Sequence, residues 1–323
     1  MMRIGVIGLG FMGGVHLKYW QLTKGVEVAA VCDADPNAGK AVKGNLDVAG
    51  DEMDLSGATR YLDVADMLAN EMLDAVSITL PTHLHKPIAI QCMQAGVHVL
   101  CEKPMALSLE DCDEMIAVAE RTGRHLMIAH CIRFWPEYVW LKRAVENGEF
   151  GDLKVADFSR LTFAPGWSGD SWFADTAKSG GIALDLHVHD LDFIQYLFGE
   201  PASIEPRTTS LDNGIVGHIS TRMRYGSDSI VTAEASWMMP QSYGFSMSYK
   251  VVFEKAAAVF NGDGLTVFPK DGEPYEPDIA DGDGYKGEIH YFADLISGKA
   301  SEIVITAKEA RESVRLALET VQS

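Results

Sequence analysis

Five residues with chemically active side chains lie close together near the middle of the chain. The stretch 179–192 reads SGGIALDLHVHDLD and contains Asp185, His187, His189, Asp190 and Asp192. Carboxylates and imidazoles at this density serve two kinds of chemistry: they ligate a metal ion, or they move protons beside an organic cofactor. This stretch alone is consistent with both interpretations, so the rest of the chain has to separate them.

Helical spacing divides these five residues into two groups. If residues 182–198 form an α-helix, Asp185 and His189 share a face, because they are four positions apart, and Asp192 lies one turn further on. His187 then lies about 200° around the helix axis from Asp185. The residues therefore cannot all reach one metal ion unless the helix is broken. The spacing suits a carboxylate that orients an imidazole for proton transfer, and a polar helix end with one hydrogen-bonded histidine is the structural alternative.

A glycine-rich motif near the N-terminus predicts a dinucleotide site. Residues 8–13 read GLGFMG, which fits G-x-G-x-x-G, between a strand-like run and a helix-like segment. Glycines at these spacings permit a tight turn, close approach to a pyrophosphate and close helix packing, and the helix N-terminus offers N–H groups to the phosphates. We expect the cofactor to contact the loop and the first turn of the helix: Gly8, Gly10, Phe11, Met12 and Gly13.

Asp33 bears on which dinucleotide binds. It follows the second strand-like run, 20 residues after Gly13, where a carboxylate can hydrogen-bond the 2′-hydroxyl of a ribose. A carboxylate at this position repels a 2′-phosphate, and no Arg or Lys follows until Lys40. The sequence therefore favours NAD over NADP.

The elements that must position these residues alternate over the first part of the chain. The alternation of apolar strand-like runs with helix-like segments predicts a doubly wound α/β domain over 1–131, with a parallel sheet covered on both faces. Ligands bind such sheets outside the carboxyl ends of the strands. Lys103 follows one of these runs within the sequence CEKP, so it is expected near the nicotinamide, and a surface loop lysine is the alternative. The strand-like runs are 3–8, 26–32, 74–80, 97–102 and 125–130.

The pattern changes after residue 131. A helix is expected over about 136–147, and strand-like runs with alternating apolar residues follow, with the hairpin signals YGSDS and NGDG between them. This predicts an α+β second domain over 132–323 that has a mostly antiparallel open sheet with helices on one side. The tail is expected to form a closing helix.

Composition narrows the classes of partner. The chain has 323 residues, with 27 Lys plus Arg against 46 Asp plus Glu and a formal charge of −19. Nucleic-acid binders and anionic-membrane binders need a basic face, so we expect neither partner. The sequence shows no signal-peptide pattern and no apolar run near the ~18 residues that span a bilayer. Its five cysteines include no C-x-x-C pair, so we expect a cytoplasmic protein with free thiols and no metal site.

Taken together, the motifs resemble the Gfo/Idh/MocA family, the glucose–fructose oxidoreductase and inositol dehydrogenase group. The resemblance runs over nearly the whole chain and rests on VIGLGFMG, VCDADP, ITLPTHLH, GVHVLCEKPMA, RFWP and SGGIALDLHVHDLDFIQYLFG. It implies a homodimer or homotetramer formed through the sheet of the second domain. It also implies a catalytic set of Lys103, Asp185 and His189, and cofactor contacts from Pro81, His85 and Glu102.

Two positions depart from the family pattern. Position 187, often glycine in the family, is His187 here, which leaves open a role in substrate selection. Position 82, often asparagine, is Thr82, which puts the contacts on the ribose side in doubt. Neither departure removes a catalytic group.

The function predicted is an NAD-dependent dehydrogenase that oxidises a secondary hydroxyl of a sugar, polyol or cyclitol. His189 is the expected general base, because the reference pKa of histidine, ~6.5, suits proton transfer near neutrality. Lys103 is expected to polarise the reacting oxygen, and Asp185 to orient His189 or bind a neighbouring hydroxyl. Aromatic rings stack on sugars and Arg donates to hydroxyls, so the expected substrate contacts are Arg133, Trp135, Trp167, Trp172 and His187.

Three alternatives stay open at this point. The first is an NAD-retaining glycosidase of the same fold, and the second is a non-catalytic regulator that senses dinucleotides. A regulator has no need of the catalytic set, which weighs against it. The third is a metal hydrolase or lyase built on His187, His189 and Asp190, and helical spacing weighs against that one.

Overall fold

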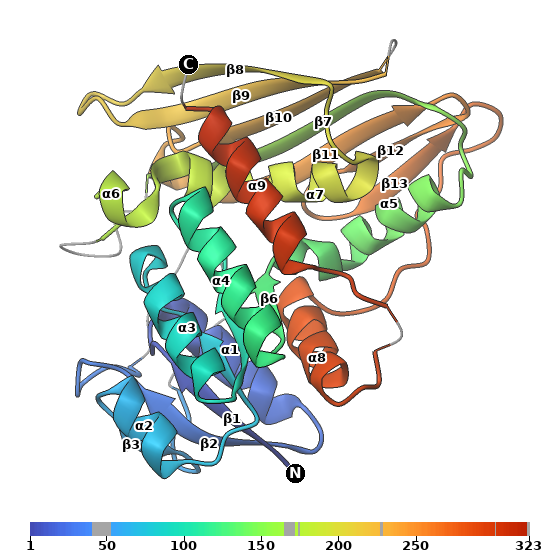
Figure 1. Ribbon diagram of the computed structural model, residues 1–323. Helices are drawn as coiled ribbons and strands as arrows, with labels where there is room; N and C mark the ends of the chain where they lie inside the picture. Colours follow the sequence, from blue (N-terminus) through green and yellow to red (C-terminus); the bar gives the residue numbers. More distant parts are fainter. Residues whose placement is uncertain (41–52, 165–171, 174, 227–228, 301, 322–323) are drawn as a thin grey trace. The chain divides into compact units, whose positions relative to one another are not determined.

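The computed structural model shows helices and strands over most of the chain (Figure 1). Within the described ranges, no helix combines the length and apolar character that a membrane span requires. The residues whose structure is described are 1–40, 53–164, 172–173, 175–226, 229–300 and 302–321.

The chain divides into two compact units, and the backbone visits each of them twice. Unit 1 comprises Met1–Cys131 and Tyr285–Val314, and unit 2 comprises Ile132–Gly284 and Arg315–Ser323. The division expected from the sequence assigned all of 132–323 to the second domain. The structure instead groups residues 285–314 with unit 1, and an amphipathic helical pattern alone does not say which body a helix will cover.

The sheet of unit 1 has the strand order β3-β2-β1-β4-β5-β6 over the described residues, and all its neighbouring strands pair in parallel. The central strands are buried because helices cover such a sheet on both faces, which explains their continuous apolar runs. The doubly wound domain predicted from the sequence is therefore confirmed. Its strands are β1 (Met2–Ile7), β2 (Val26–Cys32), β3 (Thr59–Tyr61), β4 (Ala75–Ile78), β5 (His98–Glu102) and β6 (Leu126–Ala129).

The strand order of unit 1 reverses at β1, which pairs with β2 on one side and with β4 on the other. A ligand in a sheet of this kind binds outside the carboxyl ends of the strands at such a switch point. The residues that directly follow the strands therefore matter most: Gly8 follows β1, Asp33 follows β2, Thr79 follows β4 and Lys103 follows β5.

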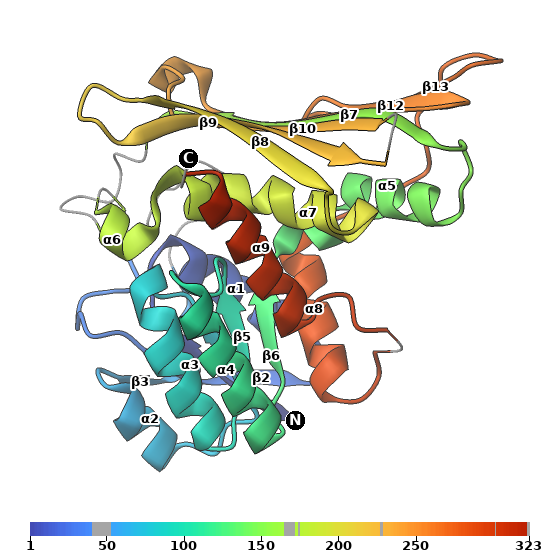
Figure 2. The ribbon, with the colours of Figure 1, turned by 45° about the horizontal axis from the view of Figure 1, so that its top comes forward.

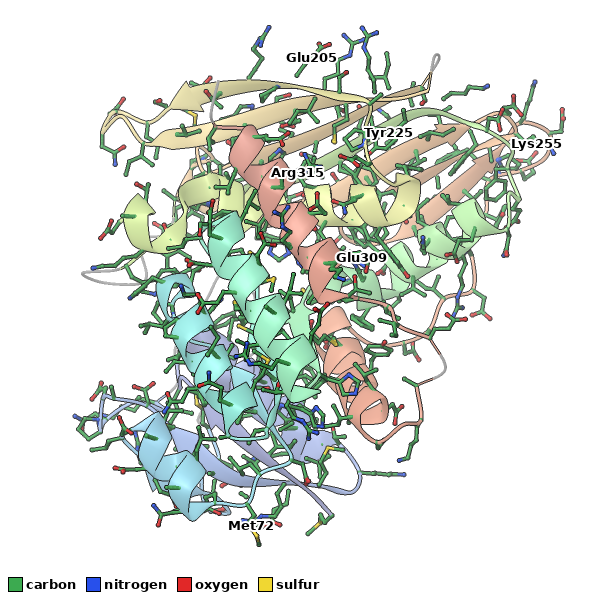
Figure 3. The ribbon with its side chains drawn as sticks, in the orientation of Figure 1. Met72, Glu205, Tyr225, Lys255, Glu309 and Arg315 are labelled. Atoms are coloured by element: carbon green, nitrogen blue, oxygen red, sulfur yellow. The ribbon has the colours of Figure 1, made fainter. Side chains whose placement is uncertain are left out.

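Seven helical segments complete unit 1, counted over its described residues. Figures 1 and 2 both show α3 and α4 side by side. The start of α9 is fixed by a capping box, in which Thr306 N–H donates to Glu309 Oε2 at 2.8 Å and Glu309 N–H donates to Thr306 Oγ1 at 3.1 Å (Glu309 is labelled in Figure 3). The segments are α1 (Phe11–Leu22), α2 (Val64–Asn70), η1 (Thr82–Leu84), α3 (His85–Gln94), α4 (Leu109–Thr122), α8 (Gly284–Ile296) and α9 (Ala307–Glu319), the last of which extends into unit 2.

The sheet of unit 2 has the order β13-β12-β11-β7-β10-β9-β8 over the described residues. Only β7 and β10 pair in parallel among these neighbours, so the predicted mostly antiparallel open sheet is confirmed. Its strands are β7 (Leu153–Thr162), β8 (Ser203–Ser210), β9 (Val216–Tyr225), β10 (Ser229–Ser236), β11 (Phe245–Phe253), β12 (Ala256–Phe260) and β13 (Leu265–Pro269).

Figure 2 shows α5 and α7 on one face of this sheet. An aromatic core holds them there: the ring of Tyr138, from α5, packs edge-on against Phe193 of α7 at 4.8 Å and against Tyr249 of β11 at 5.2 Å. Tyr225 of β9 (Figure 3) donates from its hydroxyl to the carbonyl of Gly199, just after α7. The helical segments of unit 2 are η2 (Cys131–Phe134), α5 (Pro136–Glu146), α6 (Thr176–Ser179), η3 (Ala183–His187), α7 (Val188–Phe198) and η4 (Gln241–Tyr243).

Candidate active site

The glycine loop of unit 1 closes tightly on itself and leaves one open position. Gly8 has φ +94°, and a Cβ there would lie 2.8 Å from the carbonyl oxygen of Thr79. A Cβ on Gly13 would lie 2.1 Å from the carbonyl oxygen of Gly8, so neither position tolerates a side chain. Gly10 is different, because it is exposed and nothing lies within 4 Å of where its Cβ would be.

The open position lies at the start of α1. Gly10 is the N-cap and supplies no side-chain cap, and the half-buried residues Phe11 and Met12 form the first turn. The first N–H groups of an α-helix have no partner within the helix and favour an anion. The cradle over Gly10 therefore fits a pyrophosphate, and the residues present are those that a dinucleotide needs.

Asp33 is held where the second strand ends. Its Oδ2 accepts from the N–H of Leu9 at 2.8 Å, and its Oδ1 accepts from the N–H of Asp35 at 2.9 Å. The carboxylate thus ties the glycine loop to the end of β2. Each carboxylate oxygen still has a lone pair for a further donor, such as a ribose hydroxyl.

His85 connects two loops at the carboxyl edge of the sheet of unit 1. Its ring is fully buried, with Nδ1 at 2.8 Å from the carbonyl oxygen of Pro104 and Nε2 at 2.8 Å from that of Leu80. Burial lowers the pKa of His85, against the opposing effect of the two carbonyls. The ring is therefore placed to hold the loops after β4 and β5 together, while Pro81 between them is half-buried.

Glu102 and Lys103 lie at the end of β5. Glu102 is buried, and its Oε2 accepts from the backbone N–H of Lys103 at 3.1 Å. Burial raises the pKa of Glu102, but the hydrogen bond to His16 and the positive charge of Lys103 outweigh burial and lower it overall. The Lys103 side chain is half-buried, and the Lys103–Pro104 peptide bond is cis.

In unit 2, the stretch with five polar residues begins as a π-helix. The π segment η3 covers Ala183–His187, and the α-helix α7 begins only at Val188. The α-helix expected over 182–198 is therefore wrong for its first turn, and the angular separations derived from it do not apply there. Short π segments in helices are frequent at functional sites.

Three of the five polar residues have buried partners inside unit 2. His187 is fully buried, with Nε2 at 2.8 Å from Thr221 Oγ1 on β9, and burial lowers the pKa of His187 to about 3. Asp190 accepts twice from the guanidinium of Arg160, at 3.0 and 3.1 Å. Burial raises the pKa of Asp190 in spite of Arg160. Such a placement does not favour His187 as a substrate contact.

Asp192 has an arginine partner of its own. Its two carboxylate oxygens accept from Nε and Nη2 of Arg133 at 2.9 and 2.8 Å, and both side chains are buried. The guanidinium also lies 4.4 Å from the ring centre of Tyr196. Arg133, which the sequence predicts as a substrate contact, thus forms a bidentate pair with Asp192 inside unit 2.

Asp185 and His189 differ from their neighbours. Every residue from 181 to 194 is buried except these two, which are half-buried. The structure thus separates the five polar residues into three that are buried and two that are half-buried. These two are the carboxylate and the imidazole that the sequence assigned to proton transfer.

The expected aromatic substrate contacts have different surroundings. Trp135 is half-buried at the N-cap of α5, and Trp172 is half-buried and stacked on Phe173, with ring centres 4.0 Å apart. Trp167 lies outside the described residues.

Arg160 is a buried charged residue that the sequence reasoning missed. It lies on β7, where buried and half-buried residues alternate, and it occupies a buried position. A charged residue in the apolar phase of an alternating strand indicates a buried partner of opposite charge. This signal was present in the sequence.

Over the described parts of the chain, one group of three His and Glu side chains has its nitrogen and carboxylate oxygen atoms within 4.8 Å of one another: His16, Glu102 and Glu288. All three lie in unit 1. Over those same residues, no such group includes His187, His189 or Asp190, which the metal-hydrolase alternative required.

Two sequence models of protein families match the chain. One is described as an oxidoreductase family with an NAD-binding Rossmann fold and matches residues 2–130. The other is the GFO/IDH/MocA C-terminal domain and matches residues 138–259. The two matches follow the division between the parallel sheet and the mostly antiparallel one.

Several curated proteins are similar in sequence. Inositol 2-dehydrogenase of Rhizobium meliloti is 29% identical over 301 residues, which cover 90% of this chain and 82% of that protein. D-apiose dehydrogenase of Paraburkholderia graminis is 32% identical over 215 residues, covering 66% and 54%. Inositol 2-dehydrogenase 1 of Saccharopolyspora erythraea is 40% identical over 154 residues, covering 46% and 43%. The chain thus spans about half the length of these last two relatives.

Solved structures share the fold over nearly the whole chain. UDP-N-acetylglucosamine 3-dehydrogenase GnnA from Acidithiobacillus ferrooxidans matches with a TM-score of 0.80 and 25% identity, covering 99% of this chain and 96% of that one. Levoglucosan dehydrogenase in complex with NADH and levoglucosan matches with a TM-score of 0.82 and 20% identity, covering 99% and 96%, which shows the fold alone.

Proposed function

The chain belongs to the GFO/IDH/MocA oxidoreductase family, and from this premise we propose that it is an NAD-dependent dehydrogenase that oxidises a secondary hydroxyl of a sugar, polyol or cyclitol. One observation in unit 2 carries the proposal. Of the five polar residues between 185 and 192, Asp185 and His189 alone keep surface access, and His187, Asp190 and Asp192 are internally paired.

The proposed roles follow from the chemistry of each group. His189 takes the proton of the substrate hydroxyl, and Asp185 orients the imidazole or binds a neighbouring hydroxyl. Lys103, from unit 1, stabilises the oxygen as negative charge develops on it. The proposal requires Lys103 and His189 to act on the same hydroxyl, and the kinetics of their variants test this requirement.

The glycine loop and Asp33 would hold the dinucleotide. Pro81 and Glu102 are proposed to lie beside it, and His85 to contribute by fixing the loops at Leu80 and Pro104. When bound, NAD supplies the acceptor for the hydride that leaves the carbinol carbon. The protein itself binds the substrate, orients its hydroxyl and takes up the hydroxyl proton.

We favour NAD over NADP because Asp33 directly follows β2, where a carboxylate would repel a 2′-phosphate. Arg60 is a cation near this loop, and its Nη2 already donates to the carbonyls of Asp35 and Ala38, at 3.2 and 2.8 Å. The guanidinium is thus held by backbone oxygens beside the loop.

The names of the relatives support the substrate class. Inositol, D-apiose and UDP-N-acetylglucosamine appear in the names of dehydrogenases similar to this chain. All three are polyhydroxylated rings or sugars. Trp135, Trp167 and Trp172 are the proposed aromatic contacts for such a ring. We further propose a cytoplasmic homodimer or homotetramer formed through the sheet of unit 2.

The decisive experiment combines purified protein with NAD⁺ and a panel of inositols, aldoses and uronates, and follows NADH formation. Lys103→Ala and His189→Ala should each lower turnover roughly 10²- to 10⁴-fold, because each removes a group that acts in the transition state. The affinity for NAD should stay within about tenfold. Lys299→Ala, which removes an exposed lysine of unit 1, should change nothing.

Full activity of either catalytic variant would contradict the assignment. A product that appears without net NADH would instead favour a glycosidase or another reaction that regenerates NAD⁺ within each turnover. One relative, of Mediterraneibacter gnavus, is named 2,7-anhydro-N-acetylneuraminate hydratase, and this gives that second outcome a specific basis. NAD binding with no turnover of any substrate would favour the dinucleotide-sensing regulator.

A further inference from the structure

Three ionisable side chains from distant parts of the sequence meet inside unit 1. His16 comes from α1, Glu102 from the end of β5 and Glu288 from α8. Each contributes one nitrogen or carboxylate oxygen to a group whose atoms all lie within 4.8 Å of one another. The exposed fractions of the three residues are 0%, 6% and 0%. We call this group the buried triad.

A chain of hydrogen bonds fixes the imidazole of the triad. Trp20 Nε1 can only donate, and it donates to Ser77 Oγ at 2.7 Å. The Ser77 hydroxyl lies 3.1 Å from His16 Nδ1, and in a neutral ring Nδ1 accepts the Ser77 hydrogen. Nε2 then carries the hydrogen and donates to Glu102 Oε1 at 3.1 Å.

Glu102 joins the triad to the catalytic loop. Its second oxygen accepts from the backbone N–H of Lys103 at 3.1 Å. His16, Lys103 and His85 each lower the pKa of Glu102. The neighbouring thiol of Cys101 stays neutral, because burial and the charge of Glu102 raise its pKa.

α8 carries the third member to this place. The ring of Phe292, one turn after Glu288, packs edge-on against Trp20 with ring centres 6.3 Å apart. The same helix face that buries Phe292 therefore brings Glu288 to His16 and Glu102. Along the chain, the main segment of unit 2 lies between α8 and the loop at Glu102 and Lys103.

Electrostatics limits how many charges the triad can hold. Glu102 and Glu288 each have a carboxylate oxygen within 4.8 Å of the other's, and two like charges this close repel each other strongly when they are buried. When two buried carboxylates share a site, the pKa of one of them is strongly raised. One proton then belongs to the group as a whole, because the sites titrate together.

We infer that His16, Glu102 and Glu288 form a positioning triad, which shares one proton and holds the Glu102–Lys103 loop in its active geometry; its kinetic consequence rests on the function proposed above. The three residues act through Lys103 and do not touch the substrate. α8 therefore serves as a structural part of the catalytic loop.

The test compares substitutions at one position. Glu288→Ala removes the acid and should lower kcat by about 10- to 100-fold, with KM for the sugar and affinity for NAD within about threefold. Glu288→Gln mimics the protonated acid in shape and hydrogen bonding, so it should recover at least about a third of kcat. Because Gln cannot ionise, one ionisation should also disappear from the pH profile of kcat. Asp294→Asn changes the same charge at an exposed site of the same helix and should leave kcat and its pH profile unchanged.

A second readout does not depend on activity. The ¹⁵N chemical shifts of the His16 imidazole are measured against pH in the nucleotide-free protein. If the proton is shared, the curve for the wild type should differ from the curve for Glu288→Gln. If the enzyme turns over none of the sugars, the proposed function fails, and the His16 titration still decides whether the proton is shared. Identical His16 titrations in both proteins overturn the triad. A Glu288→Ala variant that loses thermal stability but keeps kcat would also overturn the triad. The same holds if the protein contains one equivalent of a divalent metal and chelation removes both the metal and the activity.

Discussion

Two of the three acids in 185–192 form buried pairs with arginines. A buried charge needs a partner, and both Asp190 and Asp192 accept two hydrogen bonds from an arginine. Bidentate pairs of this kind fix geometry as well as charge. Asp190 and Asp192 therefore help to hold α7 in place, and Asp185 is the acid to which we assign the role in proton transfer.

His187 should make the protein less stable in acid. Burial lowers its pKa from 6.5 to about 3 in the folded state, so the unfolded chain binds more protons between these values and stability falls as pH drops through this window. His187→Gln removes the titration and should flatten the pH dependence of the free energy of unfolding by up to ~1.4 kcal/mol per pH unit. Urea unfolding from pH 4.5 to 7 measures this slope.

Wild type serves as the reference for that series, and equal slopes in the two proteins would contradict the prediction. His218→Gln, on the half-exposed neighbour whose charge also lowers the pKa of His187, should change the slope far less.

Asp33 should control the choice between dinucleotides. Asp33→Ser keeps an oxygen acceptor for the N–H of Leu9 but removes the charge that would repel a 2′-phosphate. The ratio of the Kd for NADP to the Kd for NAD should fall by about tenfold or more, which corresponds to ~1.4 kcal/mol. Titration of both nucleotides by calorimetry checks the ratio, and an unchanged ratio would refute the role of the carboxylate.

At the residue scale, the sequence predicted which residue types stand at the glycine loop and how they are spaced, but it did not predict the partners of buried side chains. The glycine positions followed from steric rules, because a Cβ at Gly8 or Gly13 collides with backbone. The commitment of Arg133 to Asp192 could not be predicted, since 59 positions separate the two residues and no local pattern connects them.

The salt bridge between Arg160 and Asp190 should anchor the whole of α7 to β7. Arg160→Met leaves Asp190 buried without its partner and should cost about 3–5 kcal/mol in the free energy of unfolding. The double variant Arg160→Met/Asp190→Leu removes both charges and should recover much of this loss. Urea unfolding of the three proteins tests the pair, and a single variant that costs under about 1 kcal/mol would contradict it.

At the element scale, long periodic segments were predictable and a change of helix type was not. The run 26–32 coincides with β2, and β4 and β6 lie inside the predicted runs 74–80 and 125–130. The π segment η3 contains neither proline nor an internal glycine. Apolar periodicity in a single sequence does not distinguish such a short π segment from an α-helix.

The discontinuity of unit 1 should be visible in fragments. A fragment of residues 1–131 lacks α8, so it exposes the surface around Trp20, which is fully buried in the complete unit. We expect this fragment to lose cooperative unfolding and NAD binding. The same fragment joined by a short linker to residues 284–314 should regain both.

Circular dichroism during thermal unfolding and nucleotide titration measure these two properties. A linked fragment that carries Phe292→Ala, and so lacks the ring against Trp20, should fall between the other two. A fragment of 1–131 that melts cooperatively would show that α8 is dispensable.

At the scale of the molecule, the sequence predicted both sheets but not the path of the chain between the units. Each sheet follows from local alternation, whereas the packing of residues 285–314 depends on apolar surface that residues 1–131 present only when they are folded. The buried triad could not be predicted for the same reason, because nothing in the sequence around Glu288 connects this acid with His16 or Glu102.

The same return path sets an order of events during translation. Residues 132–284 separate the two parts of unit 1, and a ribosome adds about 5–20 residues per second. The emerging first segment therefore waits for roughly 8–30 s with its α8-facing surface uncovered. Unit 2 has its main segment complete before α8 leaves the ribosome. We therefore expect the domain that begins first to be still incomplete when most of the second has been made, and chaperones that shield apolar surface to act on it during this interval.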